Sequence, residues 1–226
     1  MSEEKPSTGK QKQIAISEFF EKNKHFLGFD SLQRAIITAV KESVDNSLDA
    51  CEEVRILPNI RIEVKRLGGD KVELIAQDNG PGIPRNSIEH VFGKFLLGSR
   101  FHAIRQTRGQ QGIGITGVVM YSQLTTGAKT RVVSKVKEDA TAVFVDLGID
   151  TRKNKAIKSG EARDTWIDNI TGEEVEHGLR IETVMNAKYQ RGRQSVYQYL
   201  RMTSIVNPHA TITLTVQDKD GGIIEE

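Results

Sequence analysis

The stretch KESVDNSLDA, residues 41–50, carries two polar side chains, Glu42 and Asn46, four residues apart. On a helix these side chains lie one turn apart on one face. A carboxylate there can act as a general base, and an amide oxygen beside it can bind a hard cation such as Mg²⁺. A solvated helix face would show the same pair, so its meaning depends on what the rest of the chain places around it.

The residues on either side of this stretch predict one long amphipathic helix. Asp30 or Ser31 is a plausible N-cap, and the helical pattern continues to about Glu53. Asn46 lies near the edge of the apolar stripe and Glu42 lies further from its centre. The stripe recurs at spacings of three, four or one and consists of Leu32, Ile36, Ala39, Val40, Val44, Leu48 and Cys51.

A β-hairpin is predicted directly after this helix. Apolar and charged residues alternate over Ile60–Lys65, and Gly68-Gly-Asp70 is a turn signal. The answering strand has Val72, Leu74 and Ala76 on one face and runs into the turn sequence DNGPGIP, residues 78–84. The pair is therefore expected to be antiparallel rather than part of a βαβ unit.

The remaining chain alternates apolar periodic segments with polar connections. Residues 98–112 are polar, basic and punctuated by glycine, which is typical of a mobile loop or lid, and residues 150–176 predict a long polar connection. Hairpins joined to a few helices indicate an α/β protein, an α+β two-layer sandwich with a mixed, largely antiparallel sheet. The other expected helices are 87–95, 113–124 and 194–205, and the other expected strands are 130–136, 141–147, 179–184 and 211–216.

The second glycine-rich stretch, Gly109–Gly117, precedes one of these helices. Glycines let the backbone approach a ligand, and a helix N-terminus offers free N–H groups and a positive dipole end, so the stretch can cradle a phosphate. It also matches the GxGxxG dinucleotide fingerprint, but no strand precedes it and no acidic residue follows at about 20 residues. Kinase motifs and a Walker A sequence are absent. A helix start that simply needs glycine remains the structural alternative.

Asp78 also has two interpretations. An Asp before Asn-Gly is commonly a turn former. A carboxylate at the end of a buried strand can instead accept a hydrogen bond from the exocyclic amine of adenine. Gly80 and Gly82 would then matter because a side chain at either position would fill the base pocket.

Together these stretches resemble the GHKL ATPase superfamily, and within it the B subunits of type IIB DNA topoisomerases, the topoisomerase VI family. The shared pattern consists, in chain order, of Glu42…Asn46, then Asp78-Asn-Gly80-Pro-Gly82, then Gly109-Gln-Gln-Gly112-Ile-Gly114. Further resembling stretches are SEFFEKNKHFLGF, PGIPRNSIEHVFGKFLLGSRFH, QTRGQQGIGITGVVMYSQLTTG, EHGLRIET and YQRGRQSVYQYL, so the resemblance spans nearly the whole chain.

The resemblance implies a GHKL (Bergerat) fold, with helices on one face of the sheet, that binds ATP and Mg²⁺. Glu42 is then the general base that activates water for attack on the γ-phosphate. Asn46 binds the Mg²⁺, and Asp78 recognises the adenine amine, with Gly80 and Gly82 lining the base pocket.

The resemblance assigns the remaining nucleotide contacts to the lid and the second glycine-rich stretch. Ser99 and Arg100 match a nucleotide-contacting pair in the lid. Backbone N–H groups would wrap the phosphates along Gly109, Gln110, Gln111, Gly112, Ile113, Gly114, Ile115 and Thr116.

The chain departs from the family pattern at two positions and in its domain content. Leu179 follows His-Gly where the family usually has a threonine, and Asp45 stands where a glutamate is common. We expect residues 1–13 to form a flexible arm and residues 14–226 to form the ATP-binding domain. The family's transducer domain, which carries a lysine that reaches the γ-phosphate, and its helical domain are expected to be absent.

The resemblance implies a homodimer on ATP binding that gates DNA while a separate A subunit cleaves it. The alternatives are an ATP-binding dimerisation module with little hydrolysis, or another GHKL ATPase of chaperone or silencing type.

Composition limits the cellular setting and the partners. The 226 residues are 37% hydrophobic and 27% charged, with a net charge of +2, so bulk charge predicts no strong affinity for nucleic acid. Any DNA contact would have to come from a local patch or a partner subunit.

The single cysteine excludes an internal disulfide, and the polar N-terminus lacks the apolar core of a signal peptide. With no apolar run long enough to cross a membrane, we expect a cytoplasmic protein.

Overall fold

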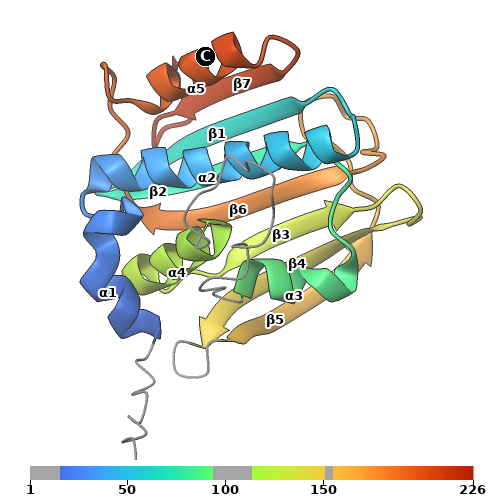
Figure 1. Cartoon of the computed structure of the whole chain (residues 1–226), viewed down its shortest axis with the longest axis horizontal. Coiled ribbons are helices and arrows are strands. Elements are labelled where there is room, and N and C mark those ends of the chain that lie inside the picture. Colours follow the sequence, from blue (N-terminus) through green and yellow to red (C-terminus); the bar gives the residue numbers. More distant parts are fainter. Residues whose placement is uncertain (1–15, 94–113, 151–154, 226) are drawn as a thin grey trace, which may run out of the picture.

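The computed structural model describes residues 16–93, 114–150 and 155–225 (Figure 1). Five helices and eight strands occur in that part of the chain. The helices are α1 (Ile16–Leu27), α2 (Leu32–Glu53), α3 (Arg85–Gly93), α4 (Gly114–Thr126) and α5 (Val196–Val206). The strands are β1 (Asn59–Gly68), β2 (Lys71–Asp78), β3 (Thr130–Lys135), β4 (Ala142–Asp150), β5 (Lys155–Asp164), β6 (Gly178–Asn186), β7 (Thr211–Gln217) and β8 (Ile223–Glu225).

The eight strands form one sheet in the order β5-β4-β3-β6-β2-β1-β7-β8. All neighbouring pairs are antiparallel except β1 and β7, which are parallel. The helices lie on one face of this sheet, with α2 crossing in front of β1 and β2 (Figure 1). The predicted two-layer sandwich with a mixed, largely antiparallel sheet is confirmed.

One continuous hydrophobic core lies between the sheet and its helices. It combines the apolar stripe of α2 with alternate residues of the central strands, such as Ile60, Ile62 and Leu74, and with the apolar side of α4. All of the predicted stripe residues are buried except Leu32. Among the described residues, no helix combines the length and the apolar character needed to cross a membrane.

The start of α2 is fixed by Ser31, one of the two predicted N-caps. Its side-chain Oγ accepts a hydrogen bond of 3.2 Å from the backbone N–H of Arg34. This bond satisfies one of the N–H groups that a helix leaves without an intrahelical acceptor. The helix therefore starts at a defined residue, and packing of its apolar stripe in the core sets which side chains face the sheet.

Part of the prediction for residues 150–176 is wrong, because residues 155–164 form the edge strand β5. Most of its side chains are exposed, so the strand has no apolar alternation that would reveal it. It is held by backbone pairing with β4 and by α3, whose Gly93 lies so close that a Cβ there would be 2.1 Å from Cβ of Ala156. The helix α1 and the short strand β8 were also not predicted.

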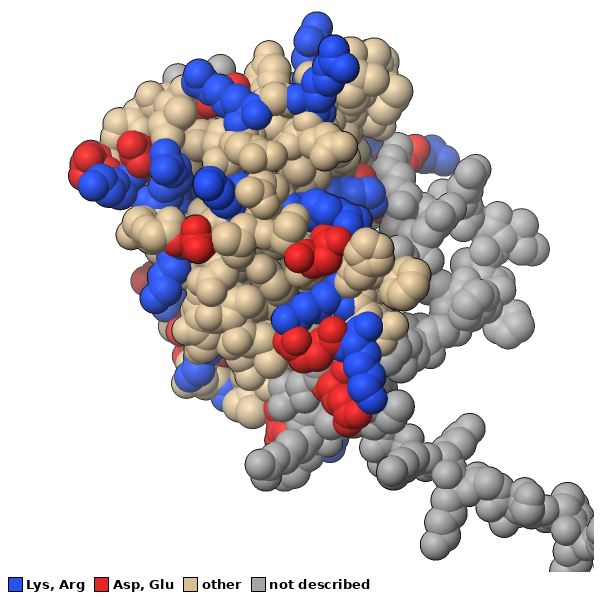
Figure 2. Space-filling view, turned by 90° about the vertical axis from the view of Figure 1, so that its left-hand side faces the viewer, with Lys and Arg blue, Asp and Glu red and all other residues tan. Residues whose placement is uncertain are grey.

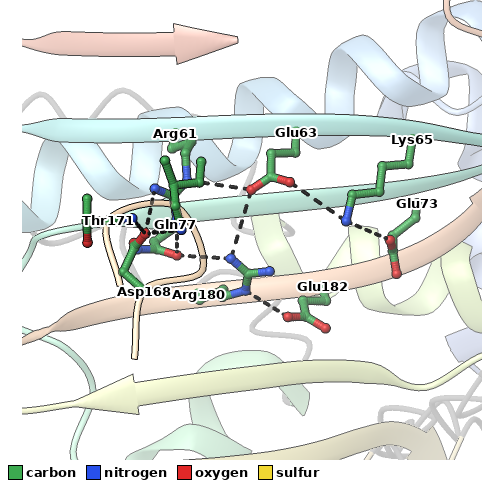
Figure 3. A network of polar contacts seen from close by, with 10 residues as sticks. Arg61, Glu63, Lys65, Glu73, Gln77, Asp168, Thr171, Arg180 and Glu182 are labelled. Atoms are coloured by element: carbon green, nitrogen blue, oxygen red, sulfur yellow. Dashed lines mark hydrogen bonds and ion pairs between the residues drawn. The ribbon is translucent and has the colours of Figure 1, made fainter. Parts of the chain in front are cut away.

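The segment after β5 folds onto the helix-free face of the sheet. Trp166 is 4% exposed and packs with Val133 and Ala142. Asp168 receives two hydrogen bonds from the Arg61 guanidinium, of 3.2 and 2.8 Å, and one of 2.7 Å from Gln77. Figure 3 shows how this contact continues along β1, β2 and β6 as a network that also includes Glu63, Lys65, Glu73, Arg180 and Glu182.

Charges of both signs are mixed at the end of the molecule that carries α1 (Figure 2). Lys22 pairs with Glu18 and Arg34 with Asp30, at 2.6 and 2.5 Å. Such pairing agrees with the small net charge of the chain, and it leaves no extended field of a single sign over α1 and the start of α2.

Candidate functional site

The carboxylate of Asp78 lies at the end of β2, buried against α2. The residue is 6% exposed. Ser47 of α2 donates a hydrogen bond of 2.6 Å to Oδ2, and the backbone N–H of Gly80 donates one of 2.9 Å to Oδ1. Burial raises the pKa of Asp78, and these hydrogen bonds oppose that rise. The predicted strand end therefore presents one oriented carboxylate on the helix-covered side of the sheet.

The two glycines after Asp78 let the loop pack closely against its neighbours. A Cβ on Gly80 would lie 3.0 Å from Asp78 Oδ1 and 3.4 Å from Cys51 Sγ. Gly82 has φ of +71°, and a Cβ there would lie 2.2 Å from the carbonyl oxygen of Lys135. The prediction placed both glycines beside an adenine. At position 82 the structure shows another reason why a side chain would not fit, because the loop packs against the backbone at the end of β3.

Glu42 and Asn46 lie one turn apart on α2 in different surroundings. The Glu42 side chain is 17% exposed, and its Oε1 lies 3.9 Å from Lys41 Nζ. Burial raises the pKa of Glu42, the Lys41 ammonium lowers it, and the charge of Asp45 raises it. Asn46 is exposed. A partly buried carboxylate thus stands beside an amide that is open to ligands.

The first turn of α4 approaches Glu42. Gly114 begins this helix with φ of +37°, and a Cβ there would lie 3.6 Å from Glu42 Oε2. Ile115 and Thr116 are buried, and Thr116 Oγ1 donates a hydrogen bond of 3.3 Å to the carbonyl of Val91. Because these side chains point into the protein, the turn presents its backbone to the space beside Glu42. The first N–H groups of a helix lack intrahelical acceptors, so this turn offers donors and the positive dipole end.

The structure therefore brings several of the predicted site residues together. Glu42 lies next to the start of α4, and α2 carries both Glu42 and Ser47, the partner of Asp78. The other predicted contacts fall outside the described residues: Ser99, Arg100, Gly109, Gln110, Gln111, Gly112 and Ile113.

Comparison with known families identifies this arrangement. Residues 31–150, just over half of the chain, match the family described as histidine kinase-, DNA gyrase B-, and HSP90-like ATPase. The chain belongs to this ATPase family. The matched range contains Glu42, Asn46, Asp78 and both glycine-rich stretches.

Curated relatives of this ATPase domain are considerably longer. The chain is 50% identical over 217 residues to the B subunit of Type 2 DNA topoisomerase 6 from Methanosarcina mazei, in a match that covers 96% of the chain and 34% of that protein. Against the protein of the same name from Archaeoglobus fulgidus it is 49% identical over 219 residues, covering 96% of the chain and 35% of the relative. The chain thus spans about a third of the length of these relatives.

A solved structure shares the fold of this ATPase domain. It is the crystal structure of the N-terminal domain of a DNA repair protein, which is 18% identical with a TM-score of 0.57. The match covers 90% of this chain and 54% of the other. It supports the fold alone.

Two further residues, His177 and Ser134, contact the backbone of the loop that follows Asp78, and neither was predicted to have a role. His177 Nδ1 lies 2.8 Å from the carbonyl oxygen of Gly80. Ser134 Oγ accepts a hydrogen bond of 2.7 Å from the backbone N–H of Ile83 and donates one of 2.9 Å to its carbonyl. His177 lay within a stretch that resembles the family, but Ser134 gave no signal because its contact depends on where β3 lies in the sheet.

Proposed function

We propose that this chain binds and hydrolyses Mg-ATP as the ATPase domain of a type IIB DNA topoisomerase, within its B subunit. The observation that carries the proposal is the arrangement on α2. One turn of this helix places the Glu42 carboxylate beside the start of α4, and the next places Ser47 against the buried Asp78. The proposed general base on α2 and the Asp78 acceptor that is held against the same helix thus lie at two places along it, which suits a nucleotide with a phosphate end and an adenine end.

In this proposal each side chain has a role that agrees with its surroundings in the structure. Glu42 accepts the proton of the attacking water, since a carboxylate with a raised pKa is a stronger base once it is ionised. Asp78 accepts a hydrogen bond from the adenine amine, with Gly80 and Gly82 holding the loop beside the base. The backbone of Gly114–Thr116 donates to phosphate oxygens.

The lid and the residues before α4 complete the proposed contacts. Ser99 and Arg100 contact the nucleotide, and Gly109, Gln110, Gln111, Gly112 and Ile113 wrap the phosphates through their N–H groups. Stabilisation of negative charge by such fixed donors supplies most of the catalysis in phosphoryl transfer.

The residues present fit a magnesium ion that is shared with the nucleotide. Asn46 offers an exposed amide oxygen one turn from Glu42. Among the described residues, no three His, Cys, Asp or Glu side chains are grouped so that they could hold a metal by themselves. Asn46 together with phosphate oxygens and water would therefore hold the Mg²⁺, as is usual for this ion. When bound, the ion would neutralise phosphate charge.

The topoisomerase part of the proposal rests on relatives about three times as long as this chain. Identity of about 50% along 96% of the chain supports an equivalent role for this domain. In the complete assembly, ATP binding would bring two copies together as a homodimer and gate the passage of DNA. Strand cleavage would belong to a separate A subunit.

Titration calorimetry with Mg-ATP tests the site directly. We expect binding by the unmodified chain and by Glu42→Gln, and greatly weakened binding by Asp78→Ala. Hydrolysis by Glu42→Gln should fall at least about 100-fold, because the general base is lost. Absence of Mg-ATP binding to a folded, unmodified chain would refute the proposal.

A second candidate function is an ATP-binding dimerisation module with little hydrolysis. Leu179 motivates it, because this residue lies opposite Asp78 in the pairing of β2 with β6 and has no hydroxyl to support the base. A backbone hydrogen bond from Leu179 still favours the ionised form of Asp78, which supports nucleotide binding in either case. Turnover and ATP-dependent dimerisation should be measured separately. Dimerisation without turnover in the unmodified chain would favour this second function.

A further inference from the structure

We propose that Tyr199 of α5 is a positioning residue for Glu42 and acts on it through Asp45 and Lys41. The inference rests on the proposed ATPase function, in which Glu42 is the general base. It adds to the site a helix that lies about 150 residues away in the sequence, far beyond the i, i+4 reach of side chains on one helix.

The first contact joins α5 to α2. The hydroxyl of Tyr199 donates a hydrogen bond of 3.0 Å to Oδ1 of Asp45, whose side chain is 12% exposed. Burial and the nearby charge of Asp45 raise the pKa of Tyr199, so the phenol stays protonated and remains a donor. Val196 and Leu200 anchor α5 in the core on either side of this contact.

The second contact uses the other oxygen of the same carboxylate. Oδ2 of Asp45 accepts a hydrogen bond of 3.0 Å from Lys41 Nζ, one turn earlier on α2. Because Tyr199 occupies Oδ1, the carboxylate of Asp45 is held in one orientation, with Oδ2 turned to Lys41. A flexible lysine side chain is thereby restricted to one region of space.

The third contact reaches the general base. The Lys41 ammonium lies 3.9 Å from Oε1 of Glu42, while Oε2 points toward the start of α4, 3.6 Å from the position of a Cβ on Gly114. The two oxygens of Glu42 thus have different neighbours among the described residues, and Oε2 is the one on the proposed phosphate side. The ammonium also favours the ionised carboxylate, which is the form that accepts a proton.

Single-turnover hydrolysis of ATP, with the full 226-residue chain in excess, tests this chain of contacts. Tyr199→Phe removes one hydroxyl and keeps the ring. We expect the rate constant of hydrolysis to fall about 5- to 10-fold, less than the roughly 100-fold loss that a displacement of about 1 Å can cause, because Glu42 itself is retained and only its positioning is loosened. The affinity for Mg-ATP should change less than about twofold, because the lost contact does not touch the nucleotide.

Matched variants separate positioning from general stability. Tyr189→Phe removes a hydroxyl that donates to the carboxylate of Glu225 instead, and it should leave the rate unchanged. Lys41→Met should slow hydrolysis at least as much as Tyr199→Phe, whereas Lys41→Arg should retain most of the rate. In the Lys41→Met background, Tyr199→Phe should add less than about twofold, because both act along one path.

Two outcomes would overturn this inference alone. One is unchanged hydrolysis in Tyr199→Phe while Glu42→Gln abolishes hydrolysis. The other is an equal loss of rate in Tyr189→Phe, which would indicate a general structural effect. If Glu42→Gln hydrolyses ATP as fast as the unmodified chain, the proposed function fails and this inference fails with it.

Discussion

The hydroxyl of Ser47 donates a hydrogen bond of 2.6 Å to Oδ2 of Asp78, across 31 positions of the sequence. Both residues are buried, at 7% and 6% exposure. The bond fixes α2 against the end of β2. It therefore ties the helix that carries Glu42 to the residue proposed to recognise adenine.

Ser47→Ala should weaken both the fold and the site. A buried carboxylate that loses a donor pays a desolvation cost, so we expect the free energy of unfolding to fall by about 1–3 kcal/mol in urea titrations. ATP affinity should fall as well, because Asp78 keeps the Gly80 N–H bond at Oδ1 but loses the donor that orients Oδ2. Ser43→Ala is the matched control, since buried Ser43 donates only within its own helix, to the carbonyl of Ala39. An equal loss of ATP affinity in both variants would contradict this prediction.

Asp78→Asn should change the nucleotide preference with little effect on the fold. The amide keeps one acceptor oxygen for Gly80 and replaces the other oxygen with a donor that Ser47 can accept. That donor would face the adenine amine, so we expect ATP affinity to fall at least about 10-fold. Calorimetry with ATP and GTP would check this, and an unchanged preference for ATP would argue against Asp78 as the reader of the base.

Gly82→Ala should destabilise the protein far more than Gly69→Ala. Both glycines have positive φ, +71° and +58°, which costs about 1–2 kcal/mol for an L-residue. Only at Gly82 would the added Cβ also meet backbone, at 2.2 Å, whereas nothing lies within 4 Å at Gly69. We expect a loss of about 3 kcal/mol or more at Gly82 and about 1 kcal/mol at Gly69, measured by urea unfolding. Equal losses would mean that the loop can move away from β3.

Asp168→Asn should destabilise the helix-free face in a pH-dependent way. Burial opposes ionisation of Asp168, but Arg61, the backbone amides of Ile170 and Thr171, and Gln77 outweigh it and hold its pKa well below the usual range. A lowered pKa stabilises the folded state above the unfolded pKa of about 3.9, and this contribution is lost as the pH falls through the folded value. We expect a loss of about 2 kcal/mol at neutral pH that shrinks below about pH 4. A difference that does not depend on pH would contradict this account.

The rate of ATP hydrolysis should show an acid limb that belongs to Glu42. Burial raises the pKa of this carboxyl above its ordinary value of 4.5, the Lys41 ammonium opposes that rise, and Asp45 adds to it. A base must be ionised to accept a proton, so the rate should fall as the pH drops through this raised pKa. Single-turnover rates across pH, with nucleotide saturating, would measure the midpoint. A midpoint at or below the ordinary value would mean that another group limits the rate.

Local sequence was sufficient for several elements in which periodicity or turn chemistry decided the structure. The stripe of α2, the Ser31 cap and the hairpin at Gly68–Asp70 all depend on neighbours within a few residues, and all were predicted. The edge strand β5 was not, because nearly every side chain in it is exposed and only pairing with β4 makes it a strand. The assignments of Ser99, Arg100 and Gly109–Ile113 remain predictions, since they lie outside the described residues.

The sequence by itself determined which residues are candidates for the site and their order in the chain, because Glu42, Asn46, Asp78 and the glycines together resemble the pattern of one family. Only the tertiary structure decided what each of them touches. Ser47 meets Asp78, and Tyr199 meets Asp45, because the sheet and helices bring distant segments together. Such contacts depend on strand order and helix packing, and no local pattern encodes those.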